Sequence, residues 1–309
     1  MNFDFSDDQK FLKNEARKFL DANCPTSRVR KVLDDDAQAY DADLWKAVAA
    51  QGWLGAAIPE AHGGLGLGHL ELCVIAEELG RAVAPIPFAS TVYFLAEAVM
   101  LAGNDEQKSN LLPKIAAGEI IGAIATSEGP GVLNASSLQS TVSDGKLSGV
   151  KIPVTDGDIA NVALVLAKEN GKAGLYLADL TDASVAREAV KTLDPTRDAA
   201  KLTFKDTPVR RVGNADEGFE LLEQVFDRAA VLLAFEQTGG ADRCLEMAKD
   251  YPMERYAFGR VIASYQAIKH KLADMYVKNE LSRSNAYYGA WALNTNAPEL
   301  PVAASAARI

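Results

Sequence analysis

The hydrophobic and polar positions divide the chain into three parts. Up to about residue 119, apolar residues recur every three or four positions, which is typical of amphipathic helices. From 120 to 212 the pattern changes to short apolar runs separated by Gly, Asp, Asn and Pro, which favours strands and turns. The helical period returns at 213 and continues to 309. We therefore predict an α+β fold, predominantly α, with a helical bundle at 1–119, a small antiparallel β domain at 120–212 and a second helical bundle at 213–309.

The first helix is predicted with its start and its inward side. Ser6-Asp7-Asp8-Gln9 fits a capping box, in which Ser6 is the N-cap and Gln9 bonds back to its backbone. The helix that follows places five apolar residues on one side: Phe11, Leu12, Ala16, Phe19 and Leu20. Further helices are expected at 43–50, 92–101 and 105–117.

A glycine-rich segment, Gly63-Gly64-Leu65-Gly66-Leu67-Gly68, lies between two of these helical stretches. A loop that cradles phosphate follows a strand and carries a lysine, and this segment has neither. We interpret it as a tight connector.

Six apolar runs in the middle region are expected to be strands: 120–125, 138–142, 146–152, 162–167, 175–180 and 202–204. Asp144-Gly145 separates two of them and is a favourable two-residue hairpin turn. A small antiparallel sandwich or barrel between helical parts follows from this pattern.

Two long helices are predicted in the last part, at about 215–250 and 262–293. Gly239-Gly240 in the first would allow a neighbouring helix to approach closely. The second carries Ile268, Leu272, Met275 and Tyr276 on one face. A third helix begins around 298–301, and its alanine-rich end has no cap, so we expect the second bundle to be incomplete.

Composition narrows the functional classes. The 309 residues carry a formal net charge of −10, which argues against a general nucleic-acid binder. Three distant cysteines (Cys24, Cys73 and Cys244) and three histidines fit neither a disulfide framework nor a metal site. An acidic N-terminus and the lack of an apolar run of about 20 residues indicate no signal peptide and no membrane span. We expect a cytoplasmic protein.

The strongest motif joins the two long helices. The sequence reads Glu254-Arg255-Tyr256-Ala257-Phe258-Gly259-Arg260, and Gln266 follows six residues later. The forked guanidinium of Arg255 suits a phosphate or a carboxylate. On the residues alone, an ordinary helix–turn–helix joint with a surface arginine is the favoured reading.

The string E-R-x-x-F-G-R-x-I-x-x-x-Q-x-I-x-x-x-L-A-D-M closely resembles the C-terminal helical segment of acyl-CoA dehydrogenases. The glycine-rich connector and the helix ending in E-E-L-G-R-A at 77–82 resemble the same family. The resemblance implies the three-part fold and FAD as the cofactor. It also implies that Arg255 lies against the FAD diphosphate and that Phe258 and Gln266 contact the cofactor across a dimer interface.

Two further segments are similar to the flavin-facing edge of that family. Where the family pattern reads T-E-P-x-A-G-S-D, this chain reads T-S-E-G-P-G-V-L-N at 126–134, with Ser127 in the place of the threonine. The family pattern G-x-K-x-W-I-T-N-G corresponds to G-V-K-I-P-V-T-D-G at 149–157. The resemblance implies that the hydroxyls of Ser127 and Thr155 bond the flavin rim; turn hydroxyls bonding their own backbone are the alternative. Pro153 replaces the tryptophan and the G-S-D triplet is absent, which puts the usual substrate pocket in question.

The implied reaction is the formation of an α,β-double bond in an acyl-CoA thioester, with a carboxylate as the base and an electron-transfer flavoprotein as the electron acceptor. In most of the family the base follows a GG-x-G stretch near the C-terminus, and none occurs before Ile309, so the base is expected beyond it. A minority place a glutamate on the preceding long helix, where this chain has Ala229. Asp227, two residues away, lies about 200° around the helix and is a poor substitute.

Three readings of function stay open. The first is an FAD-dependent acyl-CoA dehydrogenase of fatty-acid, other lipid or steroid degradation, assembled as a dimer or tetramer. The second is a non-catalytic or half-site subunit paired with an unlike dehydrogenase chain, as in steroid-CoA enzymes. The third is flavin-dependent oxidation of a nitroalkane or hydroxylation of an aromatic compound. Four cations are candidates for the CoA phosphates or are ordinary surface charges: Arg210, Arg211, Arg243 and Lys249.

Overall fold

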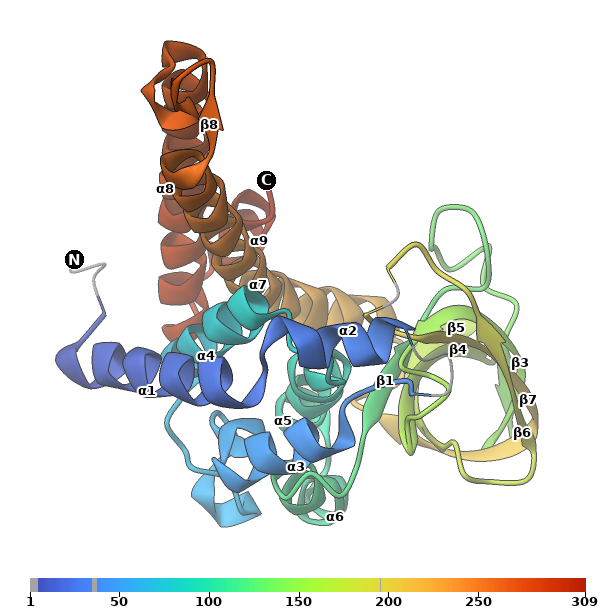
Figure 1. Ribbon diagram of the computed structural model, residues 1–309. Coiled ribbons are helices and arrows are strands. Elements are labelled where there is room, and N and C mark those ends of the chain that lie inside the picture. Colours follow the sequence, from blue (N-terminus) through green and yellow to red (C-terminus); the bar gives the residue numbers. More distant parts are fainter. Residues whose placement is uncertain (1–4, 35–37, 195) are drawn as a thin grey trace. The chain divides into compact units, whose positions relative to one another are not determined.

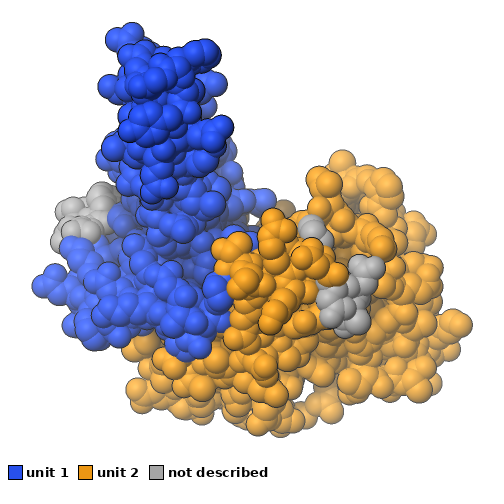
Figure 2. Space-filling view, viewed as in Figure 1, with its two compact units in different colours: residues 1–25, 69–84, 230–309 blue, residues 26–68, 85–229 orange. Residues whose placement is uncertain are grey.

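The computed structural model describes residues 5–34, 38–194 and 196–309, and it divides into two compact units (Figures 1 and 2). Unit 1 comprises residues 1–25, 69–84 and 230–309, and unit 2 comprises 26–68 and 85–229. The helices are α1 (Asp7–Asn23), α2 (Thr26–Asp34), α3 (Ala42–Ala50), α4 (His69–Ala82), α5 (Glu97–Ala102), α6 (Asp105–Ala116), α7 (Gly218–Glu254), α8 (Gln266–Asn294) and α9 (Leu300–Ala307). Short helical segments are η1 (Trp53–Gly55), η2 (Glu60–His62), the π-helical η3 (Ala89–Ala96) and η4 (Ile262–Ser264). None of the helices in the described ranges is long and apolar enough to cross a bilayer.

Unit 1 is helical, and its N-terminal helix begins as predicted. The Ser6 hydroxyl accepts the backbone N–H of Gln9, and the Gln9 side chain accepts the backbone N–H of Ser6, which completes the capping box. Ala16 and Leu20 are buried, but Phe11 is 67% exposed. The prediction that Phe11 faces the core was therefore wrong, because the buried stripe of α1 begins one turn later.

Helices α4 and α7 of unit 1 contact each other through their backbones. A Cβ added to Gly239 would lie 1.9 Å from the carbonyl oxygen of Glu77, and one added to Gly80 would lie 2.0 Å from that of Glu236. These distances are possible only for glycine, so the two backbones touch directly. The expected close approach at Gly239 is confirmed.

A buried ion-pair network surrounds this contact. The Glu77 carboxylate, 2% exposed, accepts from Lys13 of α1 at 2.7 Å and from Arg283 of α8 at 2.7 Å. Arg283 also pairs with Asp242 of α7. Burial alone would raise the pKa of Glu77, but the charges of Lys13 and Arg283 hold it below the usual value. Through Lys13, Arg283 and Asp242, this network links α1, α4, α7 and α8.

Unit 2 contains a β-barrel. Its strands are β1 (Gly122–Ala125), β2 (Thr141–Ser143), β3 (Lys146–Thr155), β4 (Val162–Glu169), β5 (Lys172–Asp179), β6 (Val185–Val190) and β7 (Ala199–Val212). The pairings β4–β2, β2–β3, β3–β7, β7–β5 and β5–β4 close a ring, which is visible in Figure 1. Closure removes most free strand edges.

Two of the strand predictions need correction. The sheet is mixed, since β1 and β2 both pair parallel to β4, so the purely antiparallel prediction was wrong at this strand. Strand β6 was not predicted. The Asp144-Gly145 turn does join β2 and β3 as expected.

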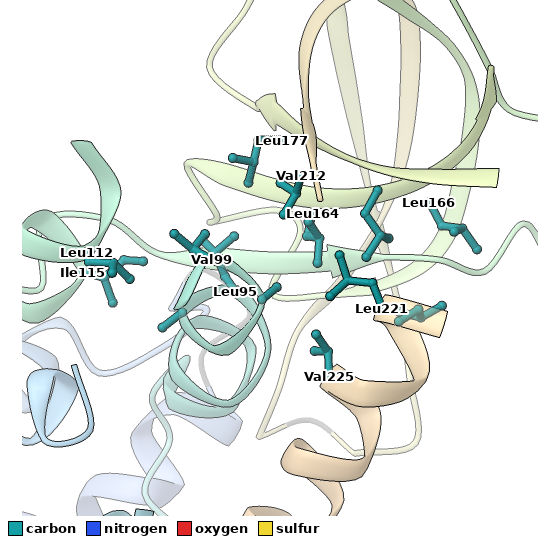
Figure 3. Close-up of a cluster of buried hydrophobic side chains, with 14 of the residues drawn as sticks. Leu95, Val99, Leu112, Ile115, Leu164, Leu166, Leu177, Val212, Leu221 and Val225 are labelled. Carbon is teal, nitrogen blue, oxygen red and sulfur yellow. The ribbon is translucent and has the colours of Figure 1, made fainter. Parts of the chain in front are cut away.

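A hydrophobic cluster packs the barrel wall against helices of the same unit (Figure 3). Leu164 and Leu166 of β4 and Leu177 of β5 face Leu95 and Val99 of the η3–α5 helix across this cluster. The other side chains labelled in the figure come from α6, β7 and the first turns of α7: Leu112, Ile115, Val212, Leu221 and Val225. Burial of each such side chain contributes about 1.5–3 kcal/mol. The cluster fixes the barrel to α5, α6 and the start of α7.

Gly239→Ala is expected to lower the free energy of unfolding by about 3 kcal/mol or more, because its methyl group would overlap the Glu77 carbonyl. Denaturant titration followed by circular dichroism measures this change. The adjacent Gly240→Ala is the control, since its Cβ would lie 3.5 Å from the nearest atom, the Gly80 carbonyl oxygen. That variant is expected to gain about 0.5–1 kcal/mol from helix propensity. Equal effects of the two variants would contradict the direct backbone contact.

Candidate functional site

The E-R-x-x-F-G-R motif forms a tight hairpin between α7 and α8. Strands β8 (Tyr256–Ala257) and β9 (Arg260–Val261) pair antiparallel around Phe258 and Gly259, whose φ angles are +52° and +78°. Positive φ at both central positions is the pattern of a type I′ turn. The expected plain helix–turn–helix joint is therefore replaced by this hairpin and by η4, and α8 begins at Gln266 rather than near Ile262.

Three predicted cofactor residues lie together on and beside this hairpin. Arg255 directly follows α7, Phe258 is at the turn and Gln266 opens α8. The Arg255 carbonyl accepts the backbone N–H of Ile262 at 2.8 Å, and the Tyr265 hydroxyl donates to the Ala257 carbonyl at 2.9 Å. These bonds keep the segment compact.

All three side chains are exposed. Phe258 is 97% exposed although its positive φ is unfavourable for an aromatic residue. The Arg255 guanidinium makes no ion pair or side-chain hydrogen bond with any described residue, and neither does the Gln266 amide. A strained aromatic beside an uncompensated cation has no packing role in this unit and is typical of a binding site.

The other two predicted cofactor residues lie in the barrel, on β3 and on the segment after β1 that contacts β3. Ser127 follows β1, and its carbonyl accepts the backbone N–H of Ile152 of β3 at 2.9 Å. Thr155 ends β3, three residues further on, which is roughly 10 Å along the strand. The Thr155 side chain is exposed, while the Ser127 hydroxyl makes long contacts with Gly129, 3.3 Å to its carbonyl and 3.4 Å to its N–H.

The structure adds a buried ion pair that the sequence analysis missed. Lys151, whose side chain is fully buried, donates to Glu128 at 2.8 Å and to the Thr126 carbonyl at 3.3 Å. Burial lowers the pKa of Lys151, although Glu128 opposes this change. A signal was present, because Lys151 lies four residues from the inward Leu147, and strand alternation places both on the buried face.

Pro153, which stands where the family has tryptophan, lies in an irregular part of β3. The register of β3 against β7 shifts between Lys151 and Val154, and the Ile152–Pro153 peptide is cis. Pro153 is exposed. The strand therefore carries a bulge between the buried lysine and the exposed Thr155 hydroxyl.

A second buried carboxyl follows Thr155. Asp156 is 4% exposed and accepts a hydrogen bond from the Ser90 hydroxyl of η3 at 2.5 Å. Burial raises the pKa of Asp156 to about 6, although Ser90 and Arg197 act in the opposite direction. The family pattern has asparagine at this position, which carries no charge to bury.

The four candidate cations for CoA phosphates are all paired with nearby carboxylates. Arg210 pairs with Glu106 at 2.8 Å, and Arg211 pairs with Glu169 and lies over the Tyr176 ring. Arg243 pairs with Glu246 at 3.2 Å and Lys249 with Asp250 at 3.1 Å. These contacts favour the reading as surface charges.

The helix position used as base by a minority of the family offers no carboxylate here. Ala229 is 1% exposed within α7. Helix α7 is continuous from Gly218 to Glu254, so Asp227 keeps its orientation about 200° from Ala229. Burial and the charge of Glu223 raise the pKa of Asp227.

The helix–barrel–helix order, together with the two motif segments, defines the class of flavin-dependent oxidoreductases. Family models for the N-terminal and C-terminal domains of acyl-CoA dehydrogenase match residues 6–119 and 216–309. Mitochondrial isovaleryl-CoA dehydrogenase of Solanum tuberosum is 30% identical, with 92% of this chain and 72% of the relative covered. Acyl-CoA dehydrogenase IpdE2 of Mycobacterium tuberculosis is 31% identical, with 90% and 74% covered.

The structure comparison agrees with these matches. The solved Tcur3481-Tcur3483 steroid ACAD superposes with a TM-score of 0.87 and is 32% identical, with 97% of this chain and 81% of that chain covered. The chain belongs to the acyl-CoA dehydrogenase family, whose members are oxidoreductases with FAD as cofactor.

Asp156→Asn is expected to change how stability depends on pH. A carboxyl whose folded pKa lies above its unfolded value stabilises the fold only while it is protonated, so its contribution is lost as pH rises from about 4 to about 6. Asparagine removes that loss and should raise the free energy of unfolding at pH 7 by up to about 3 kcal/mol relative to wild type, with little difference at pH 4.

Urea unfolding at several pH values measures this difference. Asp144→Asn is the control, because Asp144 has the same positive φ in an exposed hairpin turn. Its effect should stay within about 0.5 kcal/mol at every pH. A difference between Asp156→Asn and wild type that does not vary with pH would contradict the buried-carboxylate account.

Proposed function

We propose that this chain binds FAD and takes part in the α,β-dehydrogenation of an acyl-CoA thioester. The observation that carries the proposal is the exposed Arg255, which has no ion-pair partner among the described residues and lies beside Phe258 and Gln266 on the α7–α8 hairpin. These residues match the family motif one by one. The substrate's acyl group stays open, because the segment that replaces the family's A-G-S-D is different in this chain.

The hairpin has the chemistry of a diphosphate site. A guanidinium binds phosphate oxygens through two parallel hydrogen bonds. Helix α8 starts beside it, and its N-cap Tyr265 supplies no side-chain cap, so N–H groups of the first turn point outward. The N-terminus of this 29-residue helix adds partial positive charge. These groups fit the FAD diphosphate.

The barrel residues Ser127 and Thr155 fit the flavin half of the cofactor. The Ser127 and Thr155 hydroxyls can donate to, or accept from, polar atoms at the flavin rim. Bound FAD supplies the two-electron redox chemistry of the dehydrogenation. The proposed role of these residues is to bind and orient the cofactor.

A large apolar surface on the arm formed by α7 and α8 supports assembly with a second chain. The arm carries the hairpin at its tip (Figure 1). Its exposed apolar residues are Met247, Tyr251, Met253, Tyr256, Phe258, Met275, Tyr276, Val277 and Leu281. A concentration of exposed apolar side chains on one arm is typical of a protein interface. We propose that another dehydrogenase chain covers it, so that the hairpin of each chain reaches the FAD bound mainly by its neighbour.

The second candidate function is that of a half-site subunit in a heteromeric dehydrogenase. The altered segment at 126–134, the proline at 153 and the alanine at 229 favour it. The name of the related steroid ACAD joins two proteins, Tcur3481 and Tcur3483. Co-expression with an unlike dehydrogenase chain tests this alternative: activity with acyl-CoA only in the mixed complex supports it, and an active homo-oligomer rules it out.

Arg255→Gln is expected to weaken FAD binding by about tenfold to a hundredfold, because one charge-assisted phosphate contact contributes about 1.5–3 kcal/mol. Titration of the apoprotein with FAD, followed by flavin fluorescence, gives the dissociation constant. Arg243→Gln removes the same charge from an ion pair on α7 and should change the affinity by less than about twofold. Equal affinities of Arg255→Gln and wild type would refute the diphosphate site.

Leu281→Asp is expected to break the assembly, because it introduces a charge into the apolar surface of the arm. Light scattering after size-exclusion chromatography should show a shift from dimer or larger toward monomer. Phe11→Asp places the same charge on an exposed aromatic of α1, outside the arm, and should leave the mass unchanged. A fully active, FAD-loaded monomer of the wild-type chain would overturn the proposed assembly.

A further inference from the structure

The fully buried lysine in β3 lies next to a predicted flavin contact without being one itself. The Lys151 ammonium bonds the Thr126 carbonyl and the Glu128 carboxylate, the residues on either side of Ser127. Burying a charged lysine is costly unless it is paired and hydrogen-bonded. Since apolar residues in place of a buried ion pair often leave stability unchanged or raise it, stability alone does not account for this pair.

Glu128 also closes the loop that follows it. Its carboxylate accepts the backbone N–H of Gln139 at 2.5 Å and that of Ser140 at 2.8 Å. The bonds to Lys151, Ser140 and Gln139 outweigh burial and lower the pKa of Glu128 to about 2. One carboxylate therefore joins both ends of the 129–138 loop to β3. This loop occupies the place of the family's A-G-S-D segment.

Three contacts fix the backbone at Ser127. Its own carbonyl accepts the backbone N–H of Ile152, the residue after Lys151, at 2.9 Å. Thr126 and Glu128 are both bonded to the Lys151 ammonium. Among the described residues, the Ser127 hydroxyl bonds only to Gly129, and both of these bonds are long. The position of its hydroxyl is thus set by its neighbours.

We propose that Lys151 and Glu128 are positioning residues that fix the Ser127 hydroxyl for the flavin rim and hold the 129–138 loop as a fixed wall beside it. The inference rests on the proposed FAD function for its purpose. Its structural half, the closure of the loop by one ion pair, stands independently of any cofactor.

Lys151→Met and Glu128→Gln test the proposal, and Lys201→Met is the matched control. Lys201 pairs with Glu188 at 3.0 Å on neighbouring strands of the same barrel, but this pair is largely exposed. Hydrogen exchange of the apoprotein reports on the Gln139 and Ser140 amides, and FAD titration reports the dissociation constant and the visible spectrum of the bound flavin.

Both variants are expected to speed exchange at Gln139 and Ser140 by about tenfold or more, since each amide loses a charged acceptor or its anchor. They should weaken FAD binding by about tenfold and shift the flavin absorption bands, while Lys201→Met changes neither. Exchange in strand β4 shows whether the barrel itself has loosened. A uniform rise across β4 with unchanged FAD affinity and spectrum would mean a purely structural role and overturn the inference.

Failure of the proposed function gives a different result. If wild-type protein binds no FAD, the dehydrogenase proposal falls and the flavin role of the ion pair falls with it. Exchange at Gln139 and Ser140 then decides the loop closure alone: faster exchange in both variants supports it, and unchanged exchange refutes it.

Discussion

The direct backbone contact between α4 and α7 is the constraint on which unit 1 depends. Gly80 and Gly239 let the two helices touch, and the Glu77 carboxylate beside them receives cations from α1 and α8. Both long helices are held at this point, and the hairpin that joins them carries Arg255 at the far end of the arm. Arg255 is exposed there and has no ion-pair partner among the described residues, as the proposed phosphate contact requires.

In unit 2, a buried ion pair holds the backbone around Ser127. Lys151 and Glu128 satisfy each other and several backbone groups around Ser127. The next buried carboxyl, Asp156, accepts a hydrogen bond from the Ser90 hydroxyl, and burial raises its pKa. The half-buried Ser127 hydroxyl and the exposed Thr155 hydroxyl thus lie next to groups whose contacts hold the backbone in place. Buried charged groups such as these cost stability, and groups that break the rules of stable packing are typical of functional sites.

Much of the fold followed from local pattern, and the failures have physical causes. The capping box at Ser6, the Asp144-Gly145 turn and the long helices are local features, and the structure has them. The parallel pairing of β1 with β4 joins segments about 40 residues apart, and alternation does not report strand direction. Strand β6 is a polar edge strand with no apolar run. The division at 1–119, 120–212 and 213–309 stays a prediction.

The candidate site was predictable only where the family motif is continuous. The motif singled out Arg255, Phe258 and Gln266, but not the type I′ turn that exposes Phe258. Lys151, Glu128, Ser90 and Asp156 form pairs between distant segments, which no local pattern shows. Roles for Ser127 and Thr155 remain predictions.

The most direct test is an experimental structure of the FAD-loaded assembly. The account predicts one FAD per site, with its diphosphate within 4 Å of the Arg255 guanidinium of one chain and its flavin rim hydrogen-bonded to Ser127 or Thr155 of another dehydrogenase chain. Arg255 far from any phosphate, or FAD bound on a surface that includes neither the hairpin nor Ser127 and Thr155, would contradict it.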